Sequence, residues 1–163
     1  MGIFSGKETR TRERLVEQVL LEQYERYFRL ACSYVHSEAD AADIVQNGAY
    51  KAILNSGALK KEEYVSTWVY RIMLNEIFRF YKAPVYESLE EITEVEGKED
   101  VYEEFDLKEA LNSLDVKDKA IVELRYFEDL KLEEIAEILQ ENVSTVKSRL
   151  YRSMKKLKLR LSD

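Results

Sequence analysis

The basic residues near the end of the chain are the side chains whose types and spacing best fit a chemical role. Seven Lys and Arg residues, and no acidic residue, lie between Asn142 and Ser162. Ammonium and guanidinium groups bind phosphate oxygens and pair with the acceptor atoms of guanine in the major groove. The whole chain has a net charge of -7, so this segment carries the opposite charge to the protein around it. The contrast indicates a DNA-binding segment.

An apolar stripe predicts that this segment is a helix with one buried and one exposed face. The stripe consists of Val143, Val146, Leu150, Leu157 and Leu161. In helix-turn-helix proteins the N-terminal end of such a helix meets the base edges. The residues near that end and off the stripe are Thr145, Lys147, Ser148, Tyr151 and Arg152. Attraction to the helix C-terminus explains the later basic residues, but it does not explain cations at the start of the helix.

The acidity of the chain is concentrated in one segment. Residues 85–106 hold ten acidic residues and one base, Lys98, so they carry a net charge of -9 and leave the rest of the chain at +2. The segment has no sustained apolar period, and Pro84 disfavours helix in the residue before it. We therefore expect a flexible acidic linker over residues 83–105, between a first domain at residues 1–82 and a second at 106–163.

Apolar residues recur at helical spacing in both domains, and no stretch of any length shows the alternation typical of a β-strand. The first domain is expected to contain one helix at about residues 11–35, a second that begins after a cap at Ser37, and a third at about 62–81. In the second domain, Asp115 and Ser144 are the expected caps of two helices. The fold class predicted is all-α: two small helical domains joined by a flexible acidic linker, the second being a helix-turn-helix domain.

Composition excludes several kinds of chemistry. Cys32 and His36 are each alone, so we expect no internal disulfide, no metal centre and no cofactor. The adjacent carboxylates Glu133 and Glu134 lack a partner base or metal ligands, so we expect no enzyme and no small-molecule substrate. No stretch approaches the ~18 apolar residues of a membrane span. We expect a cytoplasmic protein without direct membrane insertion.

Two sets of motifs resemble the regions of bacterial sigma factors. The sequence 124–130, Leu-Arg-Tyr-Phe-Glu-Asp-Leu, followed by 133–139 and 143–150, resembles region 4. In the first domain, residues 43–46, Asp-Ile-Val-Gln, and residues 67–72 followed by Asn75 resemble region 2. Two such regions joined by a short linker resemble the extracytoplasmic-function sigma factors, over nearly the whole chain after residue 14.

This resemblance implies a specificity subunit that directs core RNA polymerase to promoter DNA and assists promoter melting. Region 4 would read the upstream promoter element through the five residues named above on the last helix. Region 2 would melt and read the downstream element, and single-stranded bases need stacking surfaces and cations. The matching residues are Trp68, Asn75, Arg79 and Lys82, with loop residues 55–61 near a flipped base. Trp68 also lies on the apolar stripe of its helix, so a pure core role stays open.

The resemblance also implies two protein partners. Asp43 and Gln46 would dock on the polymerase, since a carboxylate and an amide on one helical face suit a basic surface. An anti-sigma factor would hold the protein inactive. Family members usually have Glu where this chain has Asn47, which leaves open a sigma-like regulator that binds DNA or polymerase without initiating transcription. Gln140 stands where the family usually has Gly, so we expect Asn142 to supply the left-handed conformation before the last helix.

Overall fold

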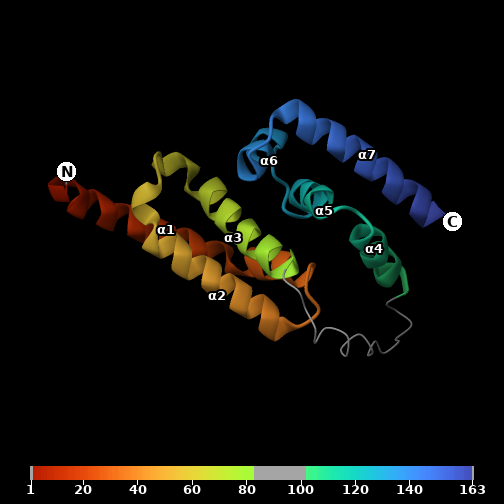
Figure 1. Ribbon diagram of the computed structural model, residues 1–163, viewed down its shortest axis with the longest axis horizontal. Helices are drawn as coiled ribbons and strands as arrows, with labels where there is room; N and C mark the ends of the chain where they lie inside the picture. The colour runs from red at the N-terminus through yellow and green to blue at the C-terminus, as the bar shows by residue number, and fades with distance from the viewer. Residues whose placement is uncertain (1, 83–101, 163) are drawn as a thin grey trace.

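The structure is a computed structural model that describes residues 2–82 and 102–162, with side chains at residues 10–81 and 106–162. Within these ranges all regular structure is helical, as predicted (Figure 1). No helix in the described ranges is long and apolar enough to cross a lipid bilayer.

Three helices form the first domain. They are α1 (Gly2–Cys32), α2 (Glu38–Leu54) and α3 (Val65–Lys82). The backbone of α1 leaves the helical conformation at Gln23. Ser37 caps α2 by accepting a hydrogen bond from the amide of Asp40 at 3.2 Å, as the sequence predicts. Each helix buries an apolar face against the other two, with Val16, Ile44 and Met73 among the buried side chains.

A loop with two short 3₁₀ helices, η1 (Ser56–Ala58) and η2 (Glu62–Tyr64), joins α2 to α3. The guanidinium of Arg12 on α1 donates to the carbonyl oxygens of Leu59 and Lys60 in this loop. The side chain of Leu59 is buried. The loop therefore has a fixed position beside the start of α3.

The second domain contains α4 (Tyr102–Asn112), α5 (Val116–Val122), α6 (Leu132–Leu139) and α7 (Val143–Ser162). A short π-helix, η6 (Glu123–Phe127), continues α5. The expected cap Asp115 accepts a hydrogen bond from the amide of Lys117. Helix α4 begins at Tyr102, inside the range assigned to the linker, and linker residues 83–101 lie outside the described residues.

The turn between α6 and α7 differs from the prediction in two details. Gln140 itself takes the left-handed conformation, with φ 60°, so Asn142 does not supply it. Asn142 instead caps α7, because its side-chain oxygen accepts from the amide of Thr145 at 3.2 Å. Ser144 is thus inside the helix. The turn is therefore completed by Gln140 at a positive φ and by Asn142 as the cap of α7, which are other local interactions than those predicted.

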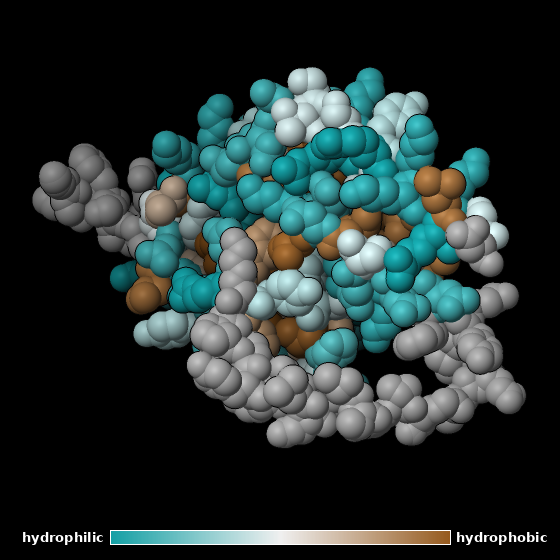
Figure 2. All heavy atoms as spheres, turned by 45° about the vertical axis from the view of Figure 1, so that its right-hand side comes forward, coloured by the Kyte–Doolittle hydropathy of each residue, from teal (hydrophilic) through white to brown (hydrophobic). Residues whose placement is uncertain are grey.

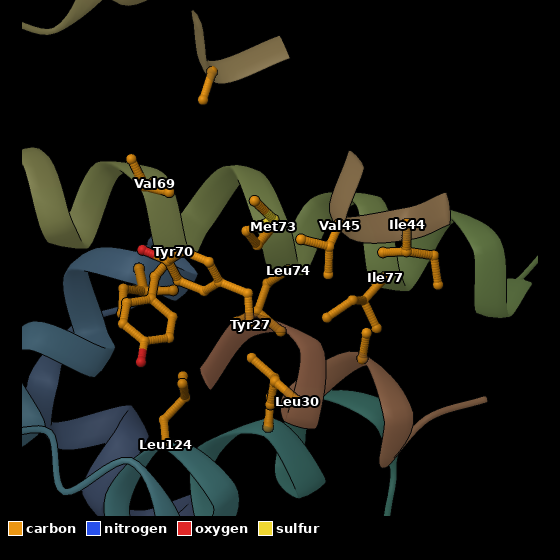
Figure 3. Close-up of a cluster of buried hydrophobic side chains, with 14 of the residues drawn as sticks. Tyr27, Leu30, Ile44, Val45, Val69, Tyr70, Met73, Leu74, Ile77 and Leu124 are labelled. Carbon is orange, nitrogen blue, oxygen red and sulfur yellow. The ribbon is translucent and has the colours of Figure 1, made fainter. Parts of the chain in front are cut away.

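The two domains share one apolar core. Tyr27 and Leu30 of α1 lie between α3 and Leu124 of the second domain in Figure 3. Leu124, Ile135 and Val146 belong to the same cluster of buried side chains as the core of the first domain. Apolar surface of this kind is removed from water only while the domains stay together. The structure is therefore a closed arrangement of the two domains, which the sequence did not predict.

Candidate nucleic-acid interface

The residues expected to read bases lie at the start of α7. Lys147, Ser148 and Arg152 are exposed, and the side chain of Tyr151 is 73% exposed. Thr145 is half-buried, and its hydroxyl lies 2.8 Å from the side-chain oxygen of Asn142. Since Val146 is fully buried against the core, the exposed face is fixed in its orientation. The structure thus places the five residues on one end of one helix.

Arg149 is the basic residue of this segment that points inward. Its guanidinium lies 2.9 Å from a carboxylate oxygen of Asp118 and 3.8 Å from one of Asp115, both on or next to α5. The ion pair joins α7 to α5, and its charges are partly withdrawn from water. Arg149 therefore orients the helix, while its neighbours Lys147 and Arg152 remain free to meet another molecule.

The residues expected to contact melted DNA follow one face of α3. Trp68, Asn75 and Arg79 are separated by seven and four positions, which places them on the same side of a helix. Asn75 and Arg79 are exposed, and Arg79 lies 3.3 Å from the buried carboxylate of Glu76. The side chain of Lys82, at the end of α3, lies outside the described residues.

Trp68 packs on the core and also borders a cavity. Its side chain is half-buried and packs against the core of the first domain. It also lines a cavity of about 570 Å³, with Tyr64 and Arg71 beside it. The remaining lining residues are Ala58, Leu59, Lys60, Lys61, Thr67, Glu137 and Gln140. An aromatic ring fixed by the core at the edge of a cavity presents a rigid surface for stacking.

Tyr64 and Arg71 are candidate residues that sequence reasoning missed. Arg71 follows Trp68 by one turn of α3, and this spacing was available in the sequence. Tyr64 belongs to η2, which the sequence analysis treated as the start of the third helix. The position of Tyr64 at the cavity depends on the conformation of the loop between α2 and α3, which no local sequence pattern predicts.

Asp43 and Gln46 lie on the outer face of α2. Both are exposed, as is Asn47, while Ile44 and Val45 on the opposite face are buried. Tyr50, one turn after Gln46, is 67% exposed. The face therefore combines a carboxylate, two amides and an aromatic ring without a partner element among the described residues.

Polar side chains join the two domains at two places. The hydroxyl of Tyr70 on α3 donates to the carboxylate of Glu128 at 2.8 Å, and Arg26 lies 4.0 Å from the same carboxylate. Glu128 is buried, with 4% of its surface exposed. Burial and the hydrogen bond to Glu128 raise the pKa of Tyr70. The hydroxyl consequently stays protonated and keeps its role as donor.

The second polar contact surrounds Lys119 of α5. Its ammonium donates to the carbonyl oxygen of Ser33 and to Asn112 at 2.6 Å, and lies 4.2 Å from the ring centre of Tyr34. Burial lowers the pKa of Lys119 to about 8. Glu123 accepts from the Ser33 hydroxyl at 2.7 Å, and burial raises the pKa of its carboxyl group.

An apolar groove of about 670 Å³ lies where the two domains meet, on the side of α1 and α4. It is lined by Phe28 and Cys32 of the first domain and by Leu107, Tyr126 and Phe127 of the second. Tyr126 and Phe127 are each 54% exposed. The face of the molecule in Figure 2 is mostly hydrophilic, with apolar side chains exposed in several places.

Comparison with protein families matches both domains. Residues 20–83 match the model of sigma-70 region 2, and residues 104–157 match that of sigma-70, region 4. The RNA polymerase sigma factor SigV of Bacillus subtilis (strain 168) is 38% identical over 162 residues, which cover 96% of each chain. The ECF RNA polymerase sigma factor SigW of the same organism is 28% identical over 158 residues, covering 85% of this chain and 84% of its own.

Two solved structures share the fold. CnrH, in complex with the cytosolic domain of CnrY, has a TM-score of 0.75 at 20% identity and covers 98% of this chain and 96% of its own. The sigma factor RpoE from Bartonella quintana, in complex with the anti-sigma factor NepR, has a TM-score of 0.70 at 23% identity, over 90% of this chain and 96% of its own. Identities this low establish the arrangement of helices alone.

Proposed function

The chain belongs to the extracytoplasmic-function sigma factors of bacterial RNA polymerase, and from that premise we propose which of its surfaces carries each part of the function. As a sigma factor it directs core polymerase to specific promoters and assists promoter melting. The proposal assigns upstream reading to α7, downstream reading and melting to α3 with its loop, and polymerase docking to α2. It acts in the cytoplasm, where polymerase and promoter DNA are.

The observation that carries this proposal is the exposed basic face at the start of α7. Lys147 and Arg152 are exposed there, while Arg149 is held by acidic partners on the other side of the helix. Lys and Arg at this end pair with guanine, and the Tyr151 ring offers contact with a thymine methyl group. If four or five of the Lys and Arg residues of α7 neutralise DNA phosphates, the logarithm of the affinity falls with the logarithm of the salt concentration at a slope of roughly -4.

The row of side chains along one face of α3 supports the downstream assignment. Trp68 supplies a fixed aromatic face, Asn75 an amide and Arg79 a cation, all on one side of the helix. The loop adds Lys60 and Lys61, which line the same cavity as Trp68. Stacking on an aromatic ring combined with nearby cations is the usual way in which proteins hold a single strand.

The outer face of α2 supports polymerase docking through Asp43 and Gln46. Asn47 lies on the same face, and its neutral amide replaces the charge that the family usually has there. Tyr50 extends the face by one turn. Asp43→Ala should weaken association with core polymerase, while Glu38→Gln, an exposed acid at the start of the same helix, serves as the control. Equal co-purification of both variants would remove α2 from the docking surface.

An anti-sigma factor is the proposed regulator, and the apolar groove between the domains is its proposed binding site. The groove exposes Leu107, Tyr126 and Phe127, which a helix of a partner protein would cover. Both solved relatives were determined in complexes, and NepR is named as an anti-sigma factor. A Phe127→Ser variant should release the protein from that partner without loss of polymerase binding.

Run-off transcription tests the whole proposal. The full chain is mixed with core polymerase and a library of genomic fragments, and transcripts absent without the chain are mapped to their start sites. We expect a common upstream and downstream sequence at these starts. Tight polymerase binding without specific transcripts would favour the alternative, a sigma-like regulator that does not itself initiate transcription.

A further inference from the structure

The segment between the two short helices of the α2–α3 loop is extended and lies outside helical hydrogen bonding. The amide of Leu59 donates to the carbonyl of Ser56 at 3.1 Å, and the amide of Tyr64 donates to that of Lys61 at 3.1 Å. Between these two turns the backbones of Leu59 and Lys61 are extended, with ψ angles of 119° and 130°. Fixing such a segment in one path costs conformational entropy, so contacts with other elements must hold it in place.

The side chain of Arg12, on α1, supplies such contacts. Its guanidinium donates from one nitrogen to the carbonyl oxygen of Leu59 and from the other to that of Lys60, the second at 3.4 Å. A guanidinium is planar, keeps its charge, and carries donors on separate nitrogens, so it can bind two neighbouring carbonyls at once. Arg12 thereby ties the backbone of the loop to a helix that lies 47 positions earlier in the chain.

The bond from Arg12 fixes the backbone from which two cations project. The side chain of Leu59 is buried and anchors the segment from one side, while the guanidinium binds its carbonyl. The next two side chains, Lys60 and Lys61, are exposed and line the cavity beside Trp68. Arg12 is not among the residues that line this cavity. Its position suits it to act on the cavity through the loop.

We propose that Arg12 is a positioning residue for downstream promoter reading: it holds the backbone of residues 59–60 so that Lys60 and Lys61 stand beside Trp68. This rests on the proposed function, which assigns downstream reading to α3 and its loop. Cations whose backbone is already fixed bind the phosphates of a strand at a smaller cost in conformational entropy. The same charges on an untethered loop would bind more weakly and discriminate less between downstream sequences.

Substitution of Arg12 in the full chain tests the proposal. The variants are assembled with core polymerase and transcribe two promoter libraries, one randomised in the downstream element and one in the upstream element. Arg12→Ala should lower discrimination among downstream sequences by about tenfold, because it removes hydrogen bonds from a charged donor. We expect upstream discrimination and co-purification with polymerase to match those of the wild type. Arg14→Ala is the matched control, since Arg14 is an exposed arginine of the same helix.

A merely structural role for Arg12 would not single out the downstream library. Arg12→Lys keeps the charge but not the two-pronged donor geometry, so it should give an intermediate loss in the same library. It also carries the test if Arg12→Ala does not fold, which thermal unfolding of each variant reports. Downstream discrimination equal to that of Arg14→Ala would overturn the proposal, and so would an equal loss in both libraries.

The double variant Lys60→Ala with Lys61→Ala separates this proposal from the one on which it rests. If the double variant loses downstream discrimination and the Arg12 variants do not, the loop reads DNA but Arg12 does not position it. If the double variant also discriminates like the wild type, the assignment of the loop to downstream DNA fails, and the role of Arg12 fails with it. Loss in both the double variant and Arg12→Ala is the expected result.

Discussion

Lys147 and Lys158 are exposed lysines at opposite ends of α7, and their different positions predict different effects on DNA binding. Lys147→Ala should relax the preference for one base pair of the upstream element, at a cost of about 1–3 kcal/mol in discrimination. Lys158→Ala should lower affinity for all sequences alike and reduce the salt slope by about 1. Selection of bound sequences from a random library by the assembled polymerase measures both. Unchanged base preferences in Lys147→Ala would show that α7 reads DNA through other residues.

Replacing Arg149 should lower the stability of the protein and not its DNA specificity. Its ion pair with Asp118, at 2.9 Å, is partly buried, so Arg149→Ala leaves a carboxylate beside α5 without its partner. We expect the free energy of unfolding in urea to fall by about 1–2 kcal/mol. Arg152→Ala is the matched control, because Arg152 is an exposed arginine three positions later. Equal stability of the two variants would mean that the ion pair contributes nothing to the position of α7.

At the scale of elements, the packing of α2 against α3 depends on Gly48. A Cβ atom at this position would lie 2.6 Å from the sulfur of Met73, which is itself buried. Gly48→Val should therefore displace the buried side chain of Met73 and lower the free energy of unfolding by about 2 kcal/mol. Asn47→Val controls for the helix propensity of valine, because Asn47 is exposed on the same helix. Thermal unfolding measures the difference, and equal melting temperatures would contradict the close approach.

The sequence predicted helices and most caps because those features depend on neighbouring residues. Ser37 and Asp115 cap the helices expected of them, each through a bond to an amide two or three residues on. The prediction for the turn before α7 was wrong in detail, since Asn142 suits both the left-handed and the capping position, and Ser144 also suits a cap. Local patterns could not choose between the two, because the choice depends on how α7 packs on α5 and α6.

At the scale of the whole molecule, the closed arrangement could not be predicted from the sequence. Its polar contacts join Tyr70 to Glu128 and Ser33 to Glu123, pairs separated by 58 and 90 positions. In the sequence these residues lie in or beside amphipathic helices, where a Glu or a Ser predicts a solvated side chain. Only the shared core, which removes both partners from water together, gives these side chains their function.

The buried ammonium of Lys119 makes the stability of this closed arrangement depend on pH. Its pKa is about 8 in the folded chain against 10.5 for an ordinary lysine, with Glu123 and Lys108 as the charged groups nearest to it. Between these values the unfolded chain holds a proton that the folded chain has released, so the free energy of unfolding rises with pH. The rise should total about 3 kcal/mol, because each pKa unit is worth about 1.4 kcal/mol.

Lys119→Met removes this contribution while keeping the apolar part of the side chain. The unfolding free energy of the wild type minus that of the variant should therefore increase as the pH rises from about 8 to about 10. The raised pKa values of Tyr27, Tyr34 and Tyr70 are common to both chains and cancel in the difference. Lys117→Met, which changes an exposed lysine of the same helix, is the matched control. Urea unfolding at several pH values measures both, and a flat or falling difference for Lys119→Met would mean that its ammonium is solvated and the domains are apart.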